Sequence, residues 1–218
     1  MAVEARTKYF DRYWRHQDLM RVSARAVWRT AKLHQAVGDR YSSLLDIGAG
    51  QGELLSHFQL IGYDVTGWDI SAHVVADLRR EGFRAKLIDL ERDELTGEYE
   101  LISCCEVLQQ VRNPDEVMRK VVDILAPGGR LFVSIPNEFH ILRCLGWGKP
   151  VESHVSLFSP RRALKLAAAA GLQIEKTYPQ PLIPPRWGRF WSAVGELMAN
   201  LIPSLFSLST AMLLKKHD

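Results

Sequence analysis

A glycine-rich segment constrains the fold of this chain more than any other feature. Residues 44–55 read LLDIGAGQGELL, in which an apolar run ends in an acid and is followed by glycines at three alternating positions. A short apolar run is typical of a buried parallel strand, and glycine allows a tight turn that comes close to a ligand. The pattern predicts a strand over about residues 43–47 and a helix over about residues 51–61. Open α/β sheets bind ligands at the carboxyl ends of their strands, so the turn indicates a nucleotide-type cofactor site.

Strand and helix patterns alternate along the rest of the chain. The sequence predicts further strands over about residues 63–69, 84–89, 100–105, 130–135, 172–177 and 208–214, and helices over about residues 71–81, 113–125 and 159–171. Ser71 and Ser159 are the expected N-caps of the first and the last of these helices. This alternation predicts an α/β, Rossmann-like fold with a mostly parallel sheet and helices on both faces. A chain of 218 residues accommodates one such domain. We expect a helical arm over residues 1–40 and the sheet domain over residues 41–218.

Composition points to an ordinary globular protein. The apolar fraction is 47% and the charged fraction 24%. Three cysteines, two of them adjacent at Cys104 and Cys105, form neither a disulfide framework nor a CxxC metal motif, which favours a reduced compartment. The first residues are charged and lack the apolar centre of a signal peptide. We therefore expect a cytoplasmic protein.

Three acids at the ends of predicted strands bear on which nucleotide cofactor binds. Asp46 lies two residues before the first glycine, where a dinucleotide would place its pyrophosphate and a carboxylate would repel it. S-adenosylmethionine (SAM) instead carries a positively charged amino group, which a carboxylate attracts. Asp69 ends the second predicted strand, where it can accept hydrogen bonds from ribose hydroxyls in either kind of site. Asp89 ends the third predicted strand and is suitably placed to accept from an adenine amino group.

Taken together, these segments resemble the class I SAM-dependent methyltransferases, in particular the branch that contains ubiquinone-biosynthesis O-methyltransferases. The resemblance covers about residues 43–176, which is most of the chain. The segments that carry it are LLDIGAGQG at 44–52, VTGWDIS at 65–71, LIDLE at 87–91, YELISCC at 99–105 and LAPGGRLFVSIPN at 125–137. Each segment alone is common, whereas their combination in this order is specific.

The resemblance implies a seven-stranded sheet whose last strand is antiparallel. It also implies contacts with SAM, and with its product S-adenosylhomocysteine, from the glycine turn and from the segments that follow the next three strands. The residues concerned are Asp46, Gly48, Ala49, Gly50, Gly52, Asp69, Ile70, Asp89, Leu90, Cys105 and Glu106. A capped turn without a ligand is the alternative, but acids and glycines at successive strand ends serve no packing purpose.

The methyl acceptor leaves a weaker trace in the sequence than the methyl donor. Methyl transfer from a sulfonium is an in-line displacement, in which the protein mainly aligns the two reactants. A general base is needed only for a hydroxyl or a protonated amine. His154, in a loop between the fifth strand and the next helix, is the candidate base, since histidine exchanges protons near neutral pH. The equal alternative is a histidine that holds the loop by hydrogen bonds to the backbone.

One departure from the related branch concerns metal binding. The segment after the fourth strand commonly reads Glu-Val-Leu-Glu-His in that branch, and in some members it holds a divalent metal. This chain has Glu106 followed by Val-Leu and then Gln109 and Gln110. One carboxylate with two neutral amides is a poor site for Mg²⁺ or Zn²⁺. We therefore expect no metal, and expect Glu106 to line the SAM pocket or cap a turn.

Aromatic and apolar residues indicate the nature of the acceptor. Tyr9, Tyr13 and Trp14 are candidates for closing the acceptor pocket, together with His154, although packing of the arm against the sheet explains them equally well. Residues 187–206 are apolar but interrupted by Pro203, which favours a short amphipathic helix over a membrane span. This segment indicates a small, apolar acceptor and leaves open contact with a membrane surface or a lipid-like substrate.

The sequence thus predicts an S-adenosylmethionine-dependent methyltransferase that acts on oxygen or nitrogen of a small, apolar molecule. Three alternatives remain: a SAM-binding partner subunit without turnover, an NAD-dependent oxidoreductase, and a methyltransferase for RNA or protein. The last is motivated by basic residues at helical spacing near the N-terminus, at positions 6, 8, 12, 15, 21, 25 and 29. Such a run is more often a solvated helix face than a nucleic-acid surface, so nucleic acid is not the expected partner.

Overall fold

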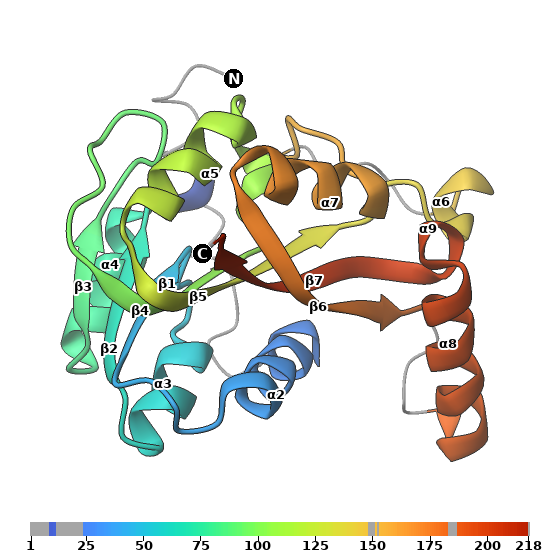
Figure 1. Cartoon of the computed structure of the whole chain (residues 1–218), viewed down its shortest axis with the longest axis horizontal. Helices are drawn as coiled ribbons and strands as arrows, with labels where there is room; N and C mark the ends of the chain where they lie inside the picture. The colour runs from blue at the N-terminus through green and yellow to red at the C-terminus, as the bar shows by residue number, and fades with distance from the viewer. Residues whose placement is uncertain (1–8, 12–23, 148–150, 152, 183–186, 218) are drawn as a thin grey trace. The chain divides into compact units, whose positions relative to one another are not determined.

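The strands form one seven-stranded sheet in a computed structural model that describes residues 9–11, 24–147, 151, 153–182 and 187–217. The strands are β1 (Ser43–Ile47), β2 (Asp64–Asp69), β3 (Arg84–Leu87), β4 (Tyr99–Cys105), β5 (Leu125–Pro136), β6 (Leu172–Pro181) and β7 (Ser207–Lys216). Their order is β3-β2-β1-β4-β5-β7-β6 (Figure 1). β1 pairs in parallel with β2 and β4, β2 pairs in parallel with β3, and β6 and β7 are antiparallel. The predicted fold class is confirmed.

The chain divides into two compact units, which we describe in turn. The first comprises Met1–Cys104 and Lys120–Phe132, and the second comprises Cys105–Arg119 and Val133–Asp218. The predicted boundary between an arm and a sheet domain near residue 40 is a different division and stays a prediction.

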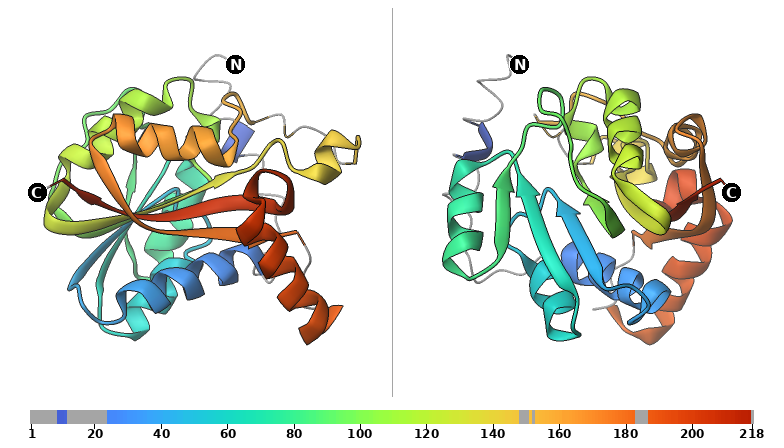
Figure 2. Two further views of the ribbon diagram at one scale, coloured as in Figure 1. Left: turned by 45° about the vertical axis from the view of Figure 1, so that its right-hand side comes forward. Right: turned by 60° about the vertical axis from the view of Figure 1, so that its left-hand side comes forward.

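The first unit is built around β1, whose Leu44, Leu45 and Ile47 are fully buried. The right-hand view of Figure 2 shows β3, β2 and β1 side by side. Its helices are α2 (Ala24–Val37), α3 (Glu53–Leu60) and α4 (Ala72–Arg80). α2 contacts α3, α3 contacts β1 and β2, and α4 contacts β2 and β3. These contacts hold the carboxyl ends of three parallel strands beside one another.

Local chemistry explains where the helices of the first unit begin. Ser71 caps α4, as predicted, because its Oγ accepts a hydrogen bond from the backbone N–H of Val74. α3 begins at Glu53, two residues later than predicted, because Gly52 has a φ of +76° and lies outside the helical region.

The second unit centres on the antiparallel pair of β6 and β7, which runs from Leu172 opposite Lys216 to Pro181 opposite Ser207. Its helices are α6 (Ile141–Cys144), α7 (Pro160–Ala169), α8 (Arg189–Leu201) and α9 (Pro203–Phe206). α7 contacts both strands, and α8 contacts β6. In Figure 1 and the left-hand view of Figure 2, α7 lies along one side of this pair and α8 extends from the other.

Two strands are longer than predicted. β5 begins at Leu125 rather than at residue 130, following α5 (Pro114–Asp123), so the Pro-Gly-Gly segment that ends the predicted helix already belongs to the strand. β6 continues to Pro181 through residues that predict a loop. β6 lies at the edge of the sheet, where a proline without an N–H is tolerated. Pairing with β7 therefore overrides the local turn signal.

The apolar C-terminal segment adopts the predicted arrangement of a short helix followed by a buried strand. α8 and α9 lead into β7, whose central residues from Ser209 to Leu214 are buried. Among the described residues, no helix is both long enough and apolar enough to cross a membrane.

Candidate functional site

The glycine turn after β1 adopts a backbone conformation that favours glycine at each of the three predicted positions. Gly48, Gly50 and Gly52 have φ angles of +76°, +52° and +76°. Such values strain other residues, and at Gly52 a Cβ atom would also lie 2.7 Å from Cδ2 of Leu78. The glycines are therefore required by the turn itself.

Two residues at the end of β2 hold this turn. The carbonyl of Trp68 accepts hydrogen bonds from the N–H groups of Gly48 (2.7 Å) and Ala49 (3.1 Å). The carboxylate of Asp69, which is buried, accepts from the N–H groups of Gly50 (3.1 Å) and Ser71 (2.9 Å). The ends of β1 and β2 are thus joined by the acid that the sequence assigns to the ribose.

Burial has the largest effect on the pKa of Asp69. Removal from water raises its pKa to about 6, although hydrogen bonds from the backbone of Ser71, Gly50 and Ile70 oppose the shift and the nearby charge of Asp11 adds to it. A ligand hydroxyl that donates to this carboxylate would further stabilise its ionised form.

Asp46, the fourth residue of β1, is buried more completely. Its burial raises the pKa to about 7, while a hydrogen bond from the Ser103 side chain and the positive charge of Arg29 oppose the shift and the charges of Glu53 and Asp69 add to it. An ammonium group beside Asp46 would replace the solvation that burial removes. The buried carboxylate of Asp46 therefore fits the amino group of SAM.

Asp89 lies beyond the end of the third strand rather than at its end as predicted, because β3 stops at Leu87. The N–H of Ile88 donates to the carbonyl of Asp69 over 2.9 Å, which keeps this segment beside the end of β2. The half-buried Asp89 accepts a hydrogen bond from the N–H of Glu91 (3.1 Å), so it also shapes the turn that follows. The next residue, Leu90, is buried.

An acid near the N-terminus joins this group, and sequence reasoning missed it. Oδ1 of Asp11 accepts hydrogen bonds from Oγ of Ser71 (2.5 Å) and from the N–H of His73 (3.3 Å). The predicted pocket residue Tyr9 packs edge to face on the buried Phe10, with ring centroids 5.2 Å apart. Asp11 lies within a run of basic and aromatic residues, so nothing in its sequence context marks it. Two other predicted pocket residues, Tyr13 and Trp14, lie outside the described part of the chain.

In the second unit, Glu106 forms a strained turn directly after the half-buried Cys105. Its φ of +59° is unusual for a residue other than glycine, and such strain concentrates at functional sites. Its N–H donates to the carbonyl of Ser134 (2.9 Å), and its Oε1 accepts from the Ser134 hydroxyl (3.2 Å). The side-chain amides of Gln109 and Gln110 donate to the Glu106 carbonyl over 2.7 Å and 3.0 Å. The two glutamines that depart from the related motif therefore stabilise this turn.

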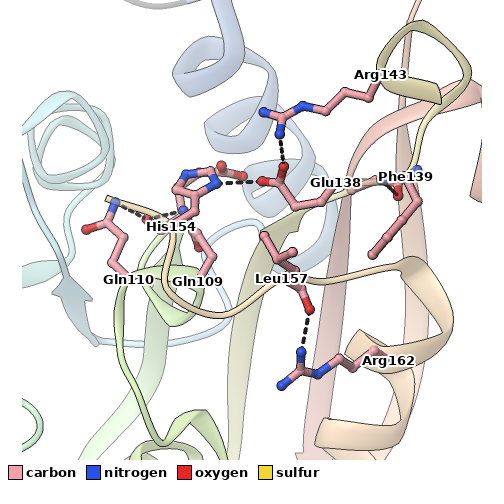
Figure 3. Close-up of polar contacts among 10 residues, drawn as sticks. Gln109, Gln110, Glu138, Phe139, Arg143, His154, Leu157 and Arg162 are labelled. Atoms are coloured by element: carbon pink, nitrogen blue, oxygen red, sulfur yellow. Dashed lines mark hydrogen bonds and ion pairs between the residues drawn. The ribbon is translucent and has the colours of Figure 1, made fainter. Parts of the chain in front are cut away.

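His154 pairs with an acid that the sequence does not single out. Its Nδ1 lies 2.5 Å from Oε1 of Glu138, and Arg143 forms an ion pair with Oε2 of the same carboxylate (Figure 3). Burial alone would raise the pKa of Glu138. The hydrogen bond from His154 and the charges of His154, Arg143 and His140 outweigh it, so the pKa lies below its ordinary value.

The predicted site residues fall into two groups. Asp46, the glycine turn, Asp69, Ile70, Asp89 and Leu90 belong to the first unit, whereas Cys105, Glu106 and His154 belong to the second. Among the described residues, no group of three His, Cys, Asp or Glu side chains is arranged to hold a metal ion.

Comparison with known proteins identifies the family. Residues 13–177 match the methyltransferase domain family. The ubiquinone biosynthesis O-methyltransferase of Aeromonas salmonicida is 26% identical over 166 residues, which is 67% of this chain and 68% of that protein. The enzyme of the same name from Shewanella pealeana is 31% identical over 103 residues, which is 44% of each chain. Most curated relatives are thus matched over about half of their own length.

Solved structures of similar fold include several methyltransferases. The N-methyltransferase NodS of Bradyrhizobium japonicum, in complex with S-adenosyl-L-homocysteine, has a TM-score of 0.68 at 14% identity, covering 98% of this chain and 99% of that one. A SAM-dependent methyltransferase of Archaeoglobus fulgidus has a TM-score of 0.67 at 15% identity, covering 96% and 99%. The [4+2]-cyclase SpnF has a TM-score of 0.64 at 18% identity, covering 92% and 84%.

The matched family and the confirmed fold class agree with the glycine turn and buried acids of the first unit. The chain belongs to the class I SAM-dependent methyltransferase family.

Proposed function

We propose that this protein transfers the methyl group of SAM to a hydroxyl oxygen of a small, apolar acceptor. The related O-methyltransferases support oxygen as the acceptor atom. The single observation that carries the proposal is the pair of buried carboxylates, Asp46 and Asp69, at the glycine turn. Buried acids without a bound cation are costly, and their raised pKa values indicate a site for a cationic ligand.

Each group of the first unit has a role in this proposal. Asp46 would bind the amino group of SAM, Asp69 the ribose hydroxyls, and Asp89 the adenine amino group. The turn from Gly48 to Gly52 would bring its backbone close to the ligand, and Ile70, Leu90, Cys105 and Glu106 would complete the binding residues. When bound, SAM supplies a methyl group on a positively charged sulfur leaving group. The protein's own contribution is alignment, and removal of the acceptor proton by His154.

The cofactor assignment is tested by calorimetric titration. We expect SAM and S-adenosylhomocysteine to bind and NAD not to bind. Binding of NAD in the absence of binding by either adenosyl compound would overturn the assignment and favour an oxidoreductase.

Turnover is a separate test, because the fold does not by itself imply methyl transfer. The similar fold of a [4+2]-cyclase and the two glutamines after Glu106 favour one second candidate, a SAM-binding protein without methyl transfer. Incubation with SAM and a pool of hydroxylated metabolites distinguishes the two. We expect acceptor-dependent formation of S-adenosylhomocysteine, whereas tight binding without any such product would favour the second candidate.

The apolar residues of α8 agree with the expectation of an apolar acceptor. Phe190, Trp191, Leu197 and Leu201 are exposed, whereas Gly195 and Ala199 are buried. Contact of residues 187–206 with a membrane surface or a lipid-like acceptor stays a prediction, as do the role of Tyr9 in the acceptor pocket and the cytoplasmic location.

A further inference from the structure

His154 and Glu138 are each fixed by backbone contacts in the second unit. The N–H of Glu138 donates to the carbonyl of Phe158 over 2.8 Å, directly after β5. The N–H of His154 donates to the carbonyl of Val151 (2.9 Å), and the next two N–H groups, of residues 155 and 156, donate to the carbonyl of Gln109. Both side chains are largely buried, with 3% of Glu138 and 11% of His154 exposed. Main-chain hydrogen bonds therefore fix the backbone of both residues, and their side chains point toward each other (Figure 3).

We propose that Glu138 is a positioning residue that fixes the tautomer of His154, so that its Nε2 can accept the proton of a hydroxyl group on an apolar acceptor. The transfer step in this inference rests on the proposed function. The tautomer of His154 rests only on contacts within the second unit. A carboxylate only accepts hydrogen bonds, so Nδ1 of His154 is the donor and a neutral ring keeps its lone pair on Nε2. Among the residues that the structure describes, none forms a hydrogen bond or an ion pair with Nε2.

The charged groups around Glu138 determine its state. Arg143, on α6, binds its second oxygen, and His140 contributes a further positive charge when protonated. These groups, together with His154, keep Glu138 ionised at neutral pH despite its burial. An ionised Glu138 holds the ring orientation, as carboxylates do for histidine bases in hydrolases.

The side chains along the same stretch of chain indicate the kind of acceptor. Six large apolar residues between positions 139 and 157 are exposed: Phe139, Leu145, Trp147, Val151, Val155 and Leu157. Exposed apolar residues on the chain segment that carries His154 suit a molecule with one polar hydroxyl on an apolar body. We therefore assign phenols and related hydroxylated apolar compounds as the acceptor class.

The transfer step balances without a further reactant. The hydroxyl proton moves to Nε2 of His154 while the acceptor oxygen forms a bond to the methyl carbon. The carbon–sulfur bond breaks and its electron pair stays on sulfur, which gives neutral S-adenosylhomocysteine, the methyl ether and an imidazolium. Release of the proton to solvent restores the neutral ring.

The tautomer is tested first, in protein labelled with ¹⁵N at histidine and without any acceptor. We expect the neutral ring of His154 to carry its proton on Nδ1 in the native protein and mainly on Nε2 in Glu138→Ala. The matched control is Glu98→Ala, an exposed glutamate in the segment before β4, which should leave the native tautomer. A native ring protonated on Nε2 would overturn the positioning role.

Turnover is then measured with each of two phenols as the acceptor. The readout is the formation of S-adenosylhomocysteine. 1-Naphthol is protonated at neutral pH and needs a base, whereas 2,4-dinitrophenol is already ionised and does not. We expect Glu138→Gln to lower kcat for 1-naphthol by about 100-fold with KM little changed, and to affect 2,4-dinitrophenol far less. Glu138→Asp, which keeps a carboxylate, should recover part of the loss, and Glu98→Gln should have no effect.

Each failure has a distinct meaning. An equal loss for both phenols would indicate a merely structural Glu138 and overturn the proposal. Absence of turnover of any phenol by native protein that binds SAM would overturn the acceptor class. Absence of SAM binding would instead contradict the proposed function. The calorimetric titration detects that outcome independently.

Discussion

The backbone N–H of Gly50 donates a hydrogen bond to Oδ2 of Asp69 over 3.1 Å, and this contact joins the glycine turn after β1 to the end of β2. The second carboxylate oxygen accepts from the N–H of Ser71, at the start of α4. Asp69 therefore both shapes the turn and presents a carboxylate for the ribose in the proposed site.

Replacement of Asp69 by alanine should weaken SAM binding by about 1–3 kcal/mol, because ribose hydroxyls lose a charged acceptor. Calorimetric titration measures the change. Asp64→Ala is the matched control, since this exposed residue lies at the opposite end of the same strand. A folded Asp69→Ala protein with native affinity would contradict the ribose assignment.

Binding of S-adenosylhomocysteine should strengthen as the pH rises from 5.5 to 8. Asp46 has a pKa of about 7 in the free protein, so it is mostly protonated below that pH and attracts an ammonium group only above it. Affinity should fall by up to about tenfold per pH unit below the pKa. Titrations across the range check this expectation, and Asp46→Asn should bind weakly with a flatter profile. A native profile as flat as that of the variant would argue against contact between Asp46 and the amino group.

The same residue should reduce the stability of the free protein. The folded pKa of Asp46 lies above its ordinary value of 3.8, so the folded state binds a proton that the unfolded state releases. The stability that this proton uptake gives the folded state is lost as the pH rises from about 4 towards 7. Asp46→Asn should therefore raise the free energy of unfolding at pH 8 by about 1–3 kcal/mol. Urea unfolding at pH 8 and pH 5 measures it, and an equal gain at both values would be inconsistent with titration of Asp46.

Asn137 should be the most sensitive polar residue of the second unit. Its buried Nδ2 donates to the carbonyls of Pro203 (3.3 Å), Ser204 (3.0 Å) and Ser207 (3.0 Å), around α9 and the start of β7. Asn137→Ala leaves the buried Ser207 carbonyl and two part-buried carbonyls without this donor and should cost about 1–3 kcal/mol. Hydrogen exchange should accelerate at residues 203–210. Asn200→Ala removes an exposed amide that bonds the Glu196 carbonyl and no other described residue. It is the control, and equal effects of both variants would discount the three-carbonyl contact.

Features that depend on neighbouring residues were predictable. The bounds of β1 and the caps at Ser71 and Ser159 match the structure, because an apolar run and a hydroxyl before a helix act locally. The glycine positions also follow from local geometry. β6 was predicted too short because its last residues are held by pairing with β7, about 30 residues further along the chain.

The partners of the site residues were not predictable for the same reason. His154 stood out by its place in a loop after β5, but Glu138, Arg143 and Asp11 carry no local signal. Glu138 meets His154, and Asp11 meets Ser71, only through the folded chain, and Arg143 joins the first pair by binding Glu138. Burial, which sets the pKa of Asp46 and Asp69, is likewise a property of the packed structure.

The position of β7 has a consequence for synthesis of the protein. Although it follows every other strand in the sequence, it lies between β5 and β6 in the sheet. Until residues 207–216 leave the ribosome, β5 and β6 lack the strand that lies between them in the native sheet. The nascent chain then presents the unpaired edges of both strands. Such edges pair readily with other chains, and their closure by a distant segment is slow. Translation that pauses within α8 or α9 should thus be the stage at which aggregation competes most strongly with folding.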